Sequence, residues 1–145
     1  MLNGFIKAHF VDYEIIKMRK DLQDKLYADF PELFCKLDSF WIPDGWHDLI
    51  YNLSAEINNI RNSLFIVDNY VEYHVIQIKS KFGGLRYYMS NSTKEMNDLI
   101  SIAEGKSYDL CGACGNHRGP RKPNESVWKE YNLCETCRIV KDIIE

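Results

Sequence analysis

The 145-residue sequence lacks several features that would place it in a broad class of protein at once. No apolar stretch approaches the roughly 18 residues that a membrane-spanning helix needs. No basic segment followed by an apolar block opens the chain, as it does in a secretory signal. Internal repeats and low-complexity linkers are also missing. These absences predict a protein of the cytoplasm with no membrane partner.

A surplus of positive charge is missing too. The net charge is −3, and the first 70 residues hold 11 acidic but only 7 basic side chains. A protein that binds the phosphates of a duplex normally carries a basic domain or stripe. The charge balance therefore argues against duplex DNA as a partner.

Signatures of catalysis are scarce. The sequence contains no Gly-x-Ser-x-Gly, His-Glu-x-x-His or paired-carboxylate motif. His47 and Asp48 are neighbours at the start of an expected helix, where their side chains diverge, and His74 lies within an expected strand. Cys35, next to Phe34, is expected to be a small core residue rather than a nucleophile. A non-enzymatic role is favoured, although a site assembled from distant residues stays open.

What the sequence does contain predicts an α+β fold, with N-terminal helices packed on a small antiparallel sheet. Apolar residues at helical spacing predict a helix over residues 12–28, a short helix opened by Asp29, and a longer helix capped by Asp44. Ser92 and Glu95 match a capping box for a further helix.

Three short segments carry the pattern of strands. Leu64-Phe65-Ile66-Val67 is a brief apolar run, and residues 71–79 are rich in β-branched and aromatic side chains. The alternation in the second segment is imperfect, which indicates a bulge near His74 or burial on both faces. Phe82-Gly83-Gly84 reads as a turn, after which residues 85–89 return as the second strand of a hairpin.

The strongest motif is a pair of Cys-x2-Cys knuckles, formed by Cys111 and Cys114 and by Cys134 and Cys137. Nineteen residues separate the two knuckles, a spacing typical of four-cysteine zinc ribbons. Disulfide pairing fits an intracellular chain poorly, and His117 is a weaker candidate ligand. Four thiolates leave no open coordination position, so the sequence predicts one structural Zn²⁺ ion.

The zinc ribbon is expected to be a module of residues 108–145 that packs on an α+β domain of residues 1–107. A terminal helix should begin within the second knuckle and dock the ribbon through an apolar face. That face comprises Leu133, Ile139, Val140, Ile143 and Ile144.

The hairpin carries a second constellation of interest. Lys79, Lys81 and Arg86 place positive charges around Gly83 and Gly84, whose backbone a ligand can approach closely. Two aromatic residues, Tyr88 and Trp46, are candidates to stack on a base. The composition suits an anionic ligand such as a nucleotide, but glycines at a turn and solvated lysines would account for it equally well. The segment lacks the Walker pattern.

Taken together, three strings resemble a family of small hypothetical proteins from bacteriophages, prophages and bacterial genomes. They are Gly45-Trp46-His47-Asp48-Leu49-Ile50, Lys81-Phe82-Gly83-Gly84-Leu85-Arg86-Tyr87-Tyr88, and the first Cys-x2-Cys knuckle. The resemblance covers roughly residues 30–137 and implies a phage-type accessory protein that acts on a host component, including antiviral defence. It implies no particular biochemical activity.

Three functions are therefore open. The first is a non-enzymatic protein that binds and sequesters a small anionic ligand, such as a nucleotide, and contains a structural zinc. The second is a protein-interaction module or inhibitor of a host protein, in which Trp41 contacts the partner. The third is a nucleic-acid-binding zinc ribbon that uses the basic segment Arg118-Gly119-Pro120-Arg121-Lys122. The sequence does not predict the oligomeric state.

Overall fold

The computed structural model describes residues 17–37, 40–67, 70–118 and 133–144, and the fold is mixed α+β. The order of elements is α2 (Lys20–Asp29), β1 (Phe40–Trp41), the 3-10 helix η2 (Asp44–Trp46), α3 (His47–Val67), β2 (Val75–Lys81), β3 (Gly84–Met89), α4 (Lys94–Ser107) and α5 (Glu135–Ile144). Among the described residues, no helix is both long and apolar enough to cross a membrane.

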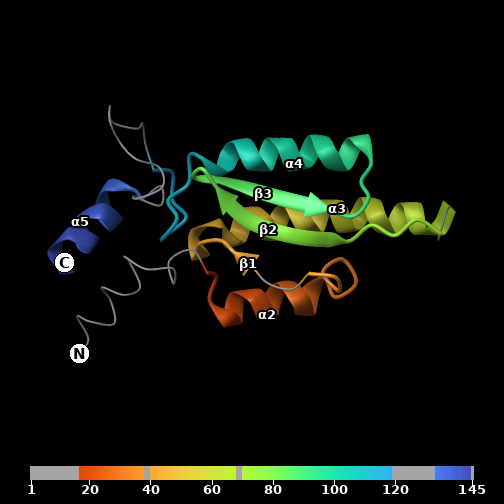
Figure 1. Ribbon diagram of the computed structural model, residues 1–145, viewed down its shortest axis with the longest axis horizontal. Coiled ribbons are helices and arrows are strands. Elements are labelled where there is room, and N and C mark those ends of the chain that lie inside the picture. Colours follow the sequence, from red (N-terminus) through yellow and green to blue (C-terminus); the bar gives the residue numbers. More distant parts are fainter. Residues whose placement is uncertain (1–16, 38–39, 68–69, 119–132, 145) are drawn as a thin grey trace.

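The three strands form one mixed sheet in the order β1-β2-β3 (Figure 1). β2 and β3 are the antiparallel hairpin that the sequence predicts. β1 instead pairs with β2 in parallel, so the prediction of a wholly antiparallel sheet is wrong. A strand of two residues carries too little periodicity for sequence reasoning to find it.

Alternate rows of residues across the sheet face opposite sides. Phe40, Ile78 and Tyr87 form one row, and all three are buried at 2% exposure or less. The next row consists of Trp41, Lys79 and Arg86, and Trp41 is 44% exposed. Successive side chains of a strand point to opposite faces, so the first row lies against the core and the second faces away from it.

Helix α3 covers the core face of the sheet, with α4 beside β3 and α2 beside β1 (Figure 1). A hydrogen bond of 2.9 Å between Tyr87 Oη and Ser54 Oγ joins β3 to α3 inside this layer. No described helix crosses in front of the other face in Figure 1. The second face of the sheet is therefore the open one among the described parts of the chain.

Helix α4 also closes the free edge of β3. The backbone N–H of Leu85 donates to Ser107 Oγ at 2.8 Å, and that of Tyr87 donates to Glu104 Oε2 at 3.1 Å. Unpaired backbone groups on an edge strand invite pairing with another chain. These two side chains therefore protect the edge.

The hairpin has a two-residue turn made by Phe82 and Gly83, with φ of 54° and 79°. Positive φ at both positions is the mark of a type I′ turn, which matches the twist of the flanking strands. A bulky residue seldom adopts this conformation, so Phe82 stores backbone strain. The expected bulge is confirmed at Ile76, two residues beyond His74, where the register shifts between Val75 and Gln77.

Helix α3 is longer than the sequence predicts. Residues Leu64–Val67, expected as a strand, form its last turn, so that prediction is wrong. Leu64 packs against the core, whereas Ile66 and Val67 are more than 80% exposed. A short apolar run cannot distinguish a strand from a helix end, and here the helix simply continues.

Two predicted helix caps are displaced. Thr93, not Ser92, caps α4, and its side-chain oxygen accepts from the backbone N–H of Met96 at 3.1 Å. Asp44 caps no helix: its carboxylate accepts from the backbone N–H of Arg19 at 2.8 Å and so holds the segment before α2. Asp29, expected to open a short helix, is instead the last residue of α2. The first part of the helix predicted over residues 12–28 lies outside the described residues.

Candidate functional site

The sulfur atoms of Cys111, Cys114, Cys134 and Cys137 all lie within 4.8 Å of one another. Those of Cys114 and Cys134 are 3.7 Å apart. Four thiolates bound to one Zn²⁺ at about 2.3 Å in a tetrahedron have their sulfurs roughly 3.8 Å apart. The cluster can therefore bind one metal ion, as the spacing predicts.

Backbone amides around the first knuckle point at the sulfur of Cys111. The N–H groups of Ala113 and Cys114 donate to it at 3.4 and 3.5 Å. Burial of Cys111 opposes its ionisation, but these amide hydrogen bonds outweigh it and lower the pKa of Cys111. Burial, and then the neighbouring charge of Cys111, raises the pKa of Cys137. A second thiolate beside the first is thus unfavourable until a cation is bound, as expected for a metal site.

Gly45 positions the first knuckle against the rest of the protein. Its N–H donates to the carbonyl of Gly112 at 2.9 Å. A side chain at Gly45 would collide with the carbonyl oxygen of Cys111 and lie 2.8 Å from the nitrogen of Gly115. Gly115 has a φ of 79°, the left-handed conformation that suits glycine. The knuckle therefore docks through backbone contacts that only small residues permit.

The terminal helix does not dock the ribbon as predicted. Leu133 is fully buried beside Cys111, but Ile139, Val140 and Ile143 are 42–79% exposed. Arg118, expected in a basic nucleic-acid-binding segment, is only 8% exposed, and its backbone N–H donates to the carbonyl of Asp109 at 2.8 Å. Arg118 is therefore buried and does not contribute to a basic surface on the ribbon. Residues 119–132, which hold the remainder of that segment, lie outside the described residues.

The predicted cations of the hairpin do share one face. Lys79 and Arg86 are directly opposite each other on β2 and β3, and Lys81 lies in the next row that faces the same way. Tyr88, 37% exposed, is opposite Gln77 on this face too, and the Lys79 ammonium lies 5.8 Å from the centre of its ring. The structure thus brings these four predicted residues together.

Arg86 is held in place by two hydrogen bonds. It donates to the carbonyl of Leu85 at 2.8 Å and to Tyr108 Oη at 3.4 Å. The bond with Tyr108 raises the pKa of Arg86 further, so the guanidinium stays charged at every accessible pH. A positioned guanidinium loses little freedom when it binds an anion, which favours a recognition role.

Three of the predicted ligand-binding residues serve the fold. Trp46 is 1% exposed and lies in the core, a burial that contradicts the predicted stacking on a base. Gly84 is buried, and a side chain there would collide with the ring of Tyr108, so the glycine makes room for that ring. Gly83 serves the type I′ turn. Trp41, which the sequence suggests only as a contact with a protein partner, is placed by β1 in the same row as Lys79.

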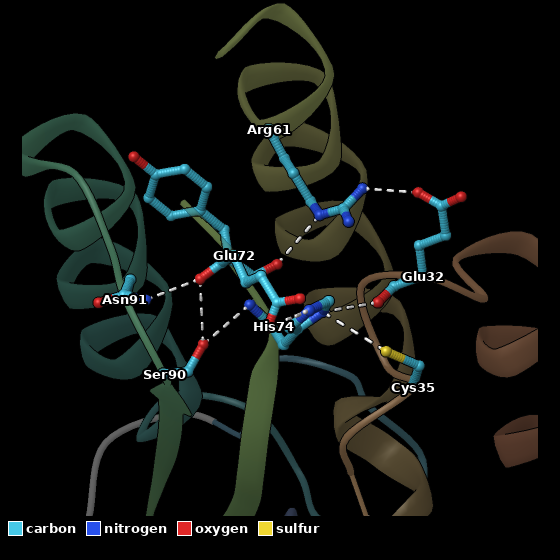
Figure 2. A network of polar contacts seen from close by, with 8 residues as sticks. Glu32, Cys35, Arg61, Glu72, His74, Ser90 and Asn91 are labelled. Carbon is cyan, nitrogen blue, oxygen red and sulfur yellow. Dashed lines mark hydrogen bonds and ion pairs between the residues drawn. The ribbon is translucent and has the colours of Figure 1, made fainter. Parts of the chain in front are cut away.

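Figure 2 shows a second polar cluster, centred on His74 at the start of β2. The Nδ1 of His74 is 2.9 Å from the carbonyl of Glu32 and 3.5 Å from Cys35 Sγ, and Nε2 is 3.8 Å from Glu72. Arg61 donates to the carbonyl of Tyr73 and to Glu32, both at 3.0 Å. Cys35 is exposed, so its predicted place in the core is wrong.

This cluster is organised for structure more than for catalysis. The close Glu32 carbonyl can only accept, so Nδ1 of His74 must carry a proton and donate it. In that state Nδ1 cannot take a proton from Cys35, as a general base would. The hydrogen bonds instead tie the turn after α2 to the end of α3 and the start of β2 (Figure 2).

A cavity of about 340 Å³ lies between α3, the end of α4 and the first knuckle. Its walls are Asp48, Leu49, Lys106, Asp109, Leu110, Gly115 and His117. None of the predicted ligand-binding residues lines it. This cavity is therefore separate from the hairpin, and the binding role of the hairpin residues stays a prediction.

Comparison of the chain with protein-family models, with curated proteins and with solved structures finds no match. The resemblance to a phage-associated family therefore stays a prediction. The part of it that the structure supports is the four-cysteine cluster.

Proposed function

We propose that this protein is a non-enzymatic binding protein for an anionic ligand that carries an aromatic ring, a nucleotide being the model case. The ligand would lie on the open face of the sheet, and one structural Zn²⁺ would hold the knuckles. The observation that carries the proposal is the direct opposition of Lys79 and Arg86 beside two exposed aromatic rings, those of Trp41 and Tyr88.

The electrostatics of this face support an anionic ligand. Like charges directly opposite each other in an antiparallel pair destabilise a sheet. A phosphate placed between Lys79 and Arg86 would replace this repulsion with two charge-assisted hydrogen bonds. Within the described residues neither side chain forms a hydrogen bond or ion pair with a carboxylate, although Glu104 contributes a weak attraction at Arg86.

The exposed aromatic side chains of this face support the other part of the proposed ligand, its aromatic ring. Trp41 and Tyr88 are 44% and 37% exposed, and aromatic side chains on a sheet are stacking platforms for bases.

The zinc assignment is supported by the sulfur geometry and by a donor set of four thiolates, which selects Zn²⁺ among the common ions. A closed four-thiolate site would stabilise the fold and leave no position for a reacting water.

The ligand proposal is tested by titrating the protein with ATP, GTP and their monophosphates while following tryptophan fluorescence and heat release. Replacing both Lys79 and Arg86 with alanine should weaken binding at least tenfold without loss of the fold. Replacing Lys36 and Lys94 with alanine removes the same charge elsewhere and should leave binding unchanged. Equal loss in both double variants would show that only net charge matters and would refute the site.

The zinc proposal is tested separately, by elemental analysis. The intact protein should contain one zinc per chain, and replacing Cys114 and Cys137 with serine should remove it and lower the melting temperature. Zinc retained in full by the serine variant would refute the ligand assignment. This experiment is independent of the sheet face, so either half of the proposal can fail alone.

A protein partner is the second candidate, favoured by one specific surface. The end of α3 and the residues after it expose Phe65, Ile66, Val67 and Tyr70, at 57–92%. Exposed apolar clusters of this kind often mark protein–protein contacts. Replacing Phe65 and Ile66 with serine would abolish binding to such a partner and leave nucleotide binding intact.

A further inference from the structure

Each exposed ring on or beside the open face has a lysine next to it. The ammonium nitrogen lies 5.8 Å from the ring centre in two of these pairs and 5.6 Å in the third. The pairs are Lys17 with Trp41, Lys79 with Tyr88, and Lys81 with Phe82. All three rings are 37–54% exposed. Aromatic and cationic groups thus alternate over one surface, a composition that binds bases and phosphates together.

The arrangement of the rings sets a minimum size for the ligand. Trp41 is on β1 and Tyr88 is on β3: Lys79 and Arg86 continue the row of Trp41 across β2 and β3, and Tyr88 lies in the adjacent row of the same face. Neighbouring strands lie about 4.8 Å apart, so the two rings are on the order of 10 Å apart across the sheet. A mononucleotide has one base and can cover only one of them. Two bases joined through a phosphate would use both rings and the two cations, Lys79 and Arg86, that lie beside them on this face.

The geometry points to single-stranded nucleic acid, of two nucleotides or more, as the ligand of this face. The inference rests on the proposed function, because it assigns to the same face a polymer in place of a free nucleotide. A duplex does not fit, since its bases stack on one another and offer no face to Trp41 or Tyr88. The net charge of −3 also limits how many phosphates the whole protein can attract.

Phe82 supports a ligand that extends to the hairpin tip. The fold holds this phenylalanine at a φ of 54° and leaves its ring 54% exposed. The exposed part of the ring, with the Lys81 ammonium 5.6 Å from its centre, offers a surface on which a third base can stack.

The test measures the fluorescence anisotropy of a labelled ten-nucleotide oligothymidylate and of the matching oligouridylate with the full chain. Thymidine monophosphate and a ten-base-pair duplex serve as competitors. The single strands should bind at least tenfold more tightly than the monophosphate or the duplex. The logarithm of the affinity should fall with the logarithm of the salt concentration with a slope of at most about 3, as expected for no more than four phosphate contacts.

Variants identify the surface. Trp41→Ala and Tyr88→Ala should each weaken binding of the single strand roughly 5- to 100-fold, because each removes one stacked base. If Tyr88→Ala folds poorly, Tyr88→Leu replaces it in the test. Leucine keeps the apolar contact in β3 but has no ring, so it should weaken binding to the same extent. Phe65→Ala, which removes an exposed ring from α3, should change nothing.

Two results would overturn the inference in different ways. If the monophosphate binds as tightly as the oligomers and only one ring matters, the ligand is a free nucleotide and the proposed function survives. If a folded, zinc-loaded protein binds neither the nucleotides nor the oligomers, the proposed function fails together with this inference.

Discussion

Lys79 on β2 and Arg86 on β3 lie directly opposite each other, so two positive charges share one cross-strand pair. A sheet gains nothing from this arrangement, because like charges in such a pair repel. An opposite charge at either position would stabilise the hairpin instead. The pair therefore lowers the stability of the hairpin, and a bound anion would relieve the repulsion between the two side chains.

The first prediction separates stability from binding at this pair. Lys79→Glu should be more stable than Lys79→Gln by about 0.2–1 kcal/mol, because only glutamate attracts Arg86. Both variants lose the ammonium group near Tyr88, so that contact cancels in the comparison. Urea unfolding of the two proteins measures the difference. Ligand binding should nevertheless be weaker in the glutamate variant, and equal stabilities would indicate that Arg86 does not sense residue 79.

Sequence reasoning succeeds here where a local pattern carries the signal. The two Cys-x2-Cys knuckles bring four sulfurs together because each pair closes within one tight turn. The hairpin is found because Phe82-Gly83-Gly84 separates two β-rich segments. The sequence also gathers Lys79, Lys81 and Arg86 around this turn, but the pairing of Lys79 with Arg86 depends on the two-residue turn, which only the structure shows.

The features missed depend on contacts between distant segments. β1 is found only through its pairing with β2, so the sequence alone does not place Trp41 on the open face of the sheet, and it wrongly selects the buried Trp46 as the stacking residue instead. The run Leu64–Val67 is apolar enough for a strand, but α3 extends through it. The docking role of Gly45 depends on a knuckle more than 60 residues away in the sequence, and no local signal reports it.

The second prediction concerns Gly84. A methyl group there would displace the ring of Tyr108, which is the far end of a side chain and can move. Gly84→Ala should therefore cost only about 1 kcal/mol of stability, but it should also break the hydrogen bond that holds Arg86. Binding should weaken more than the stability loss accounts for. Unchanged affinity would show that Tyr108 does not position Arg86 for the ligand.

The third prediction is a stabilising change at another glycine. Gly105 lies within α4, and a methyl group added there would meet no atom within 4 Å. Gly105→Ala should raise the free energy of unfolding by about 0.5–1 kcal/mol, because alanine restricts the unfolded chain and favours the helix. The midpoint of urea unfolding should rise while ligand affinity stays the same. A fall in the midpoint would contradict the prediction, because it would mean that the added methyl group collides with a neighbouring atom although none lies within 4 Å of it.

The fourth prediction concerns Tyr87, whose burial raises the pKa of its hydroxyl while the hydrogen bond with Ser54 lowers it to a smaller extent. In the unfolded chain the hydroxyl ionises near its ordinary pKa of 10.0. Deprotonation therefore favours the unfolded state, and the stability supplied by neutral Tyr87 is lost as pH rises above about 10. Urea unfolding between pH 8 and 11 should show this fall.

Tyr87→Phe should fall less steeply over the same pH range, and at neutral pH it should lose about 1 kcal/mol because Ser54 is left without its partner. Tyr70→Phe makes the same substitution at a tyrosine that is 92% exposed and serves as the matched control. If the free energy of unfolding falls with pH equally steeply in all three proteins, the hydroxyl of Tyr87 has the same pKa in the folded and the unfolded chain, which would contradict the prediction.

The fifth prediction tests whether the metal site and its docking are separable. At Gly45 the atoms that a methyl group would meet belong to the backbone of the knuckle, namely the carbonyl of Cys111 and the amide of Gly115. Backbone cannot rotate away as the Tyr108 ring can, so Gly45→Ala should cost about 1–3 kcal/mol, more than Gly84→Ala. None of the four sulfurs is touched, so zinc content should remain one per chain. Hydrogen exchange at the amide of Gly45 should quicken as the knuckle detaches, because this amide donates to Gly112, whereas the amide of Gly115 donates to Cys111 within the knuckle and should stay protected. Loss of zinc from the variant would instead mean that docking through Gly45 is needed to assemble the four thiolates, and that the ribbon does not form a metal site by itself.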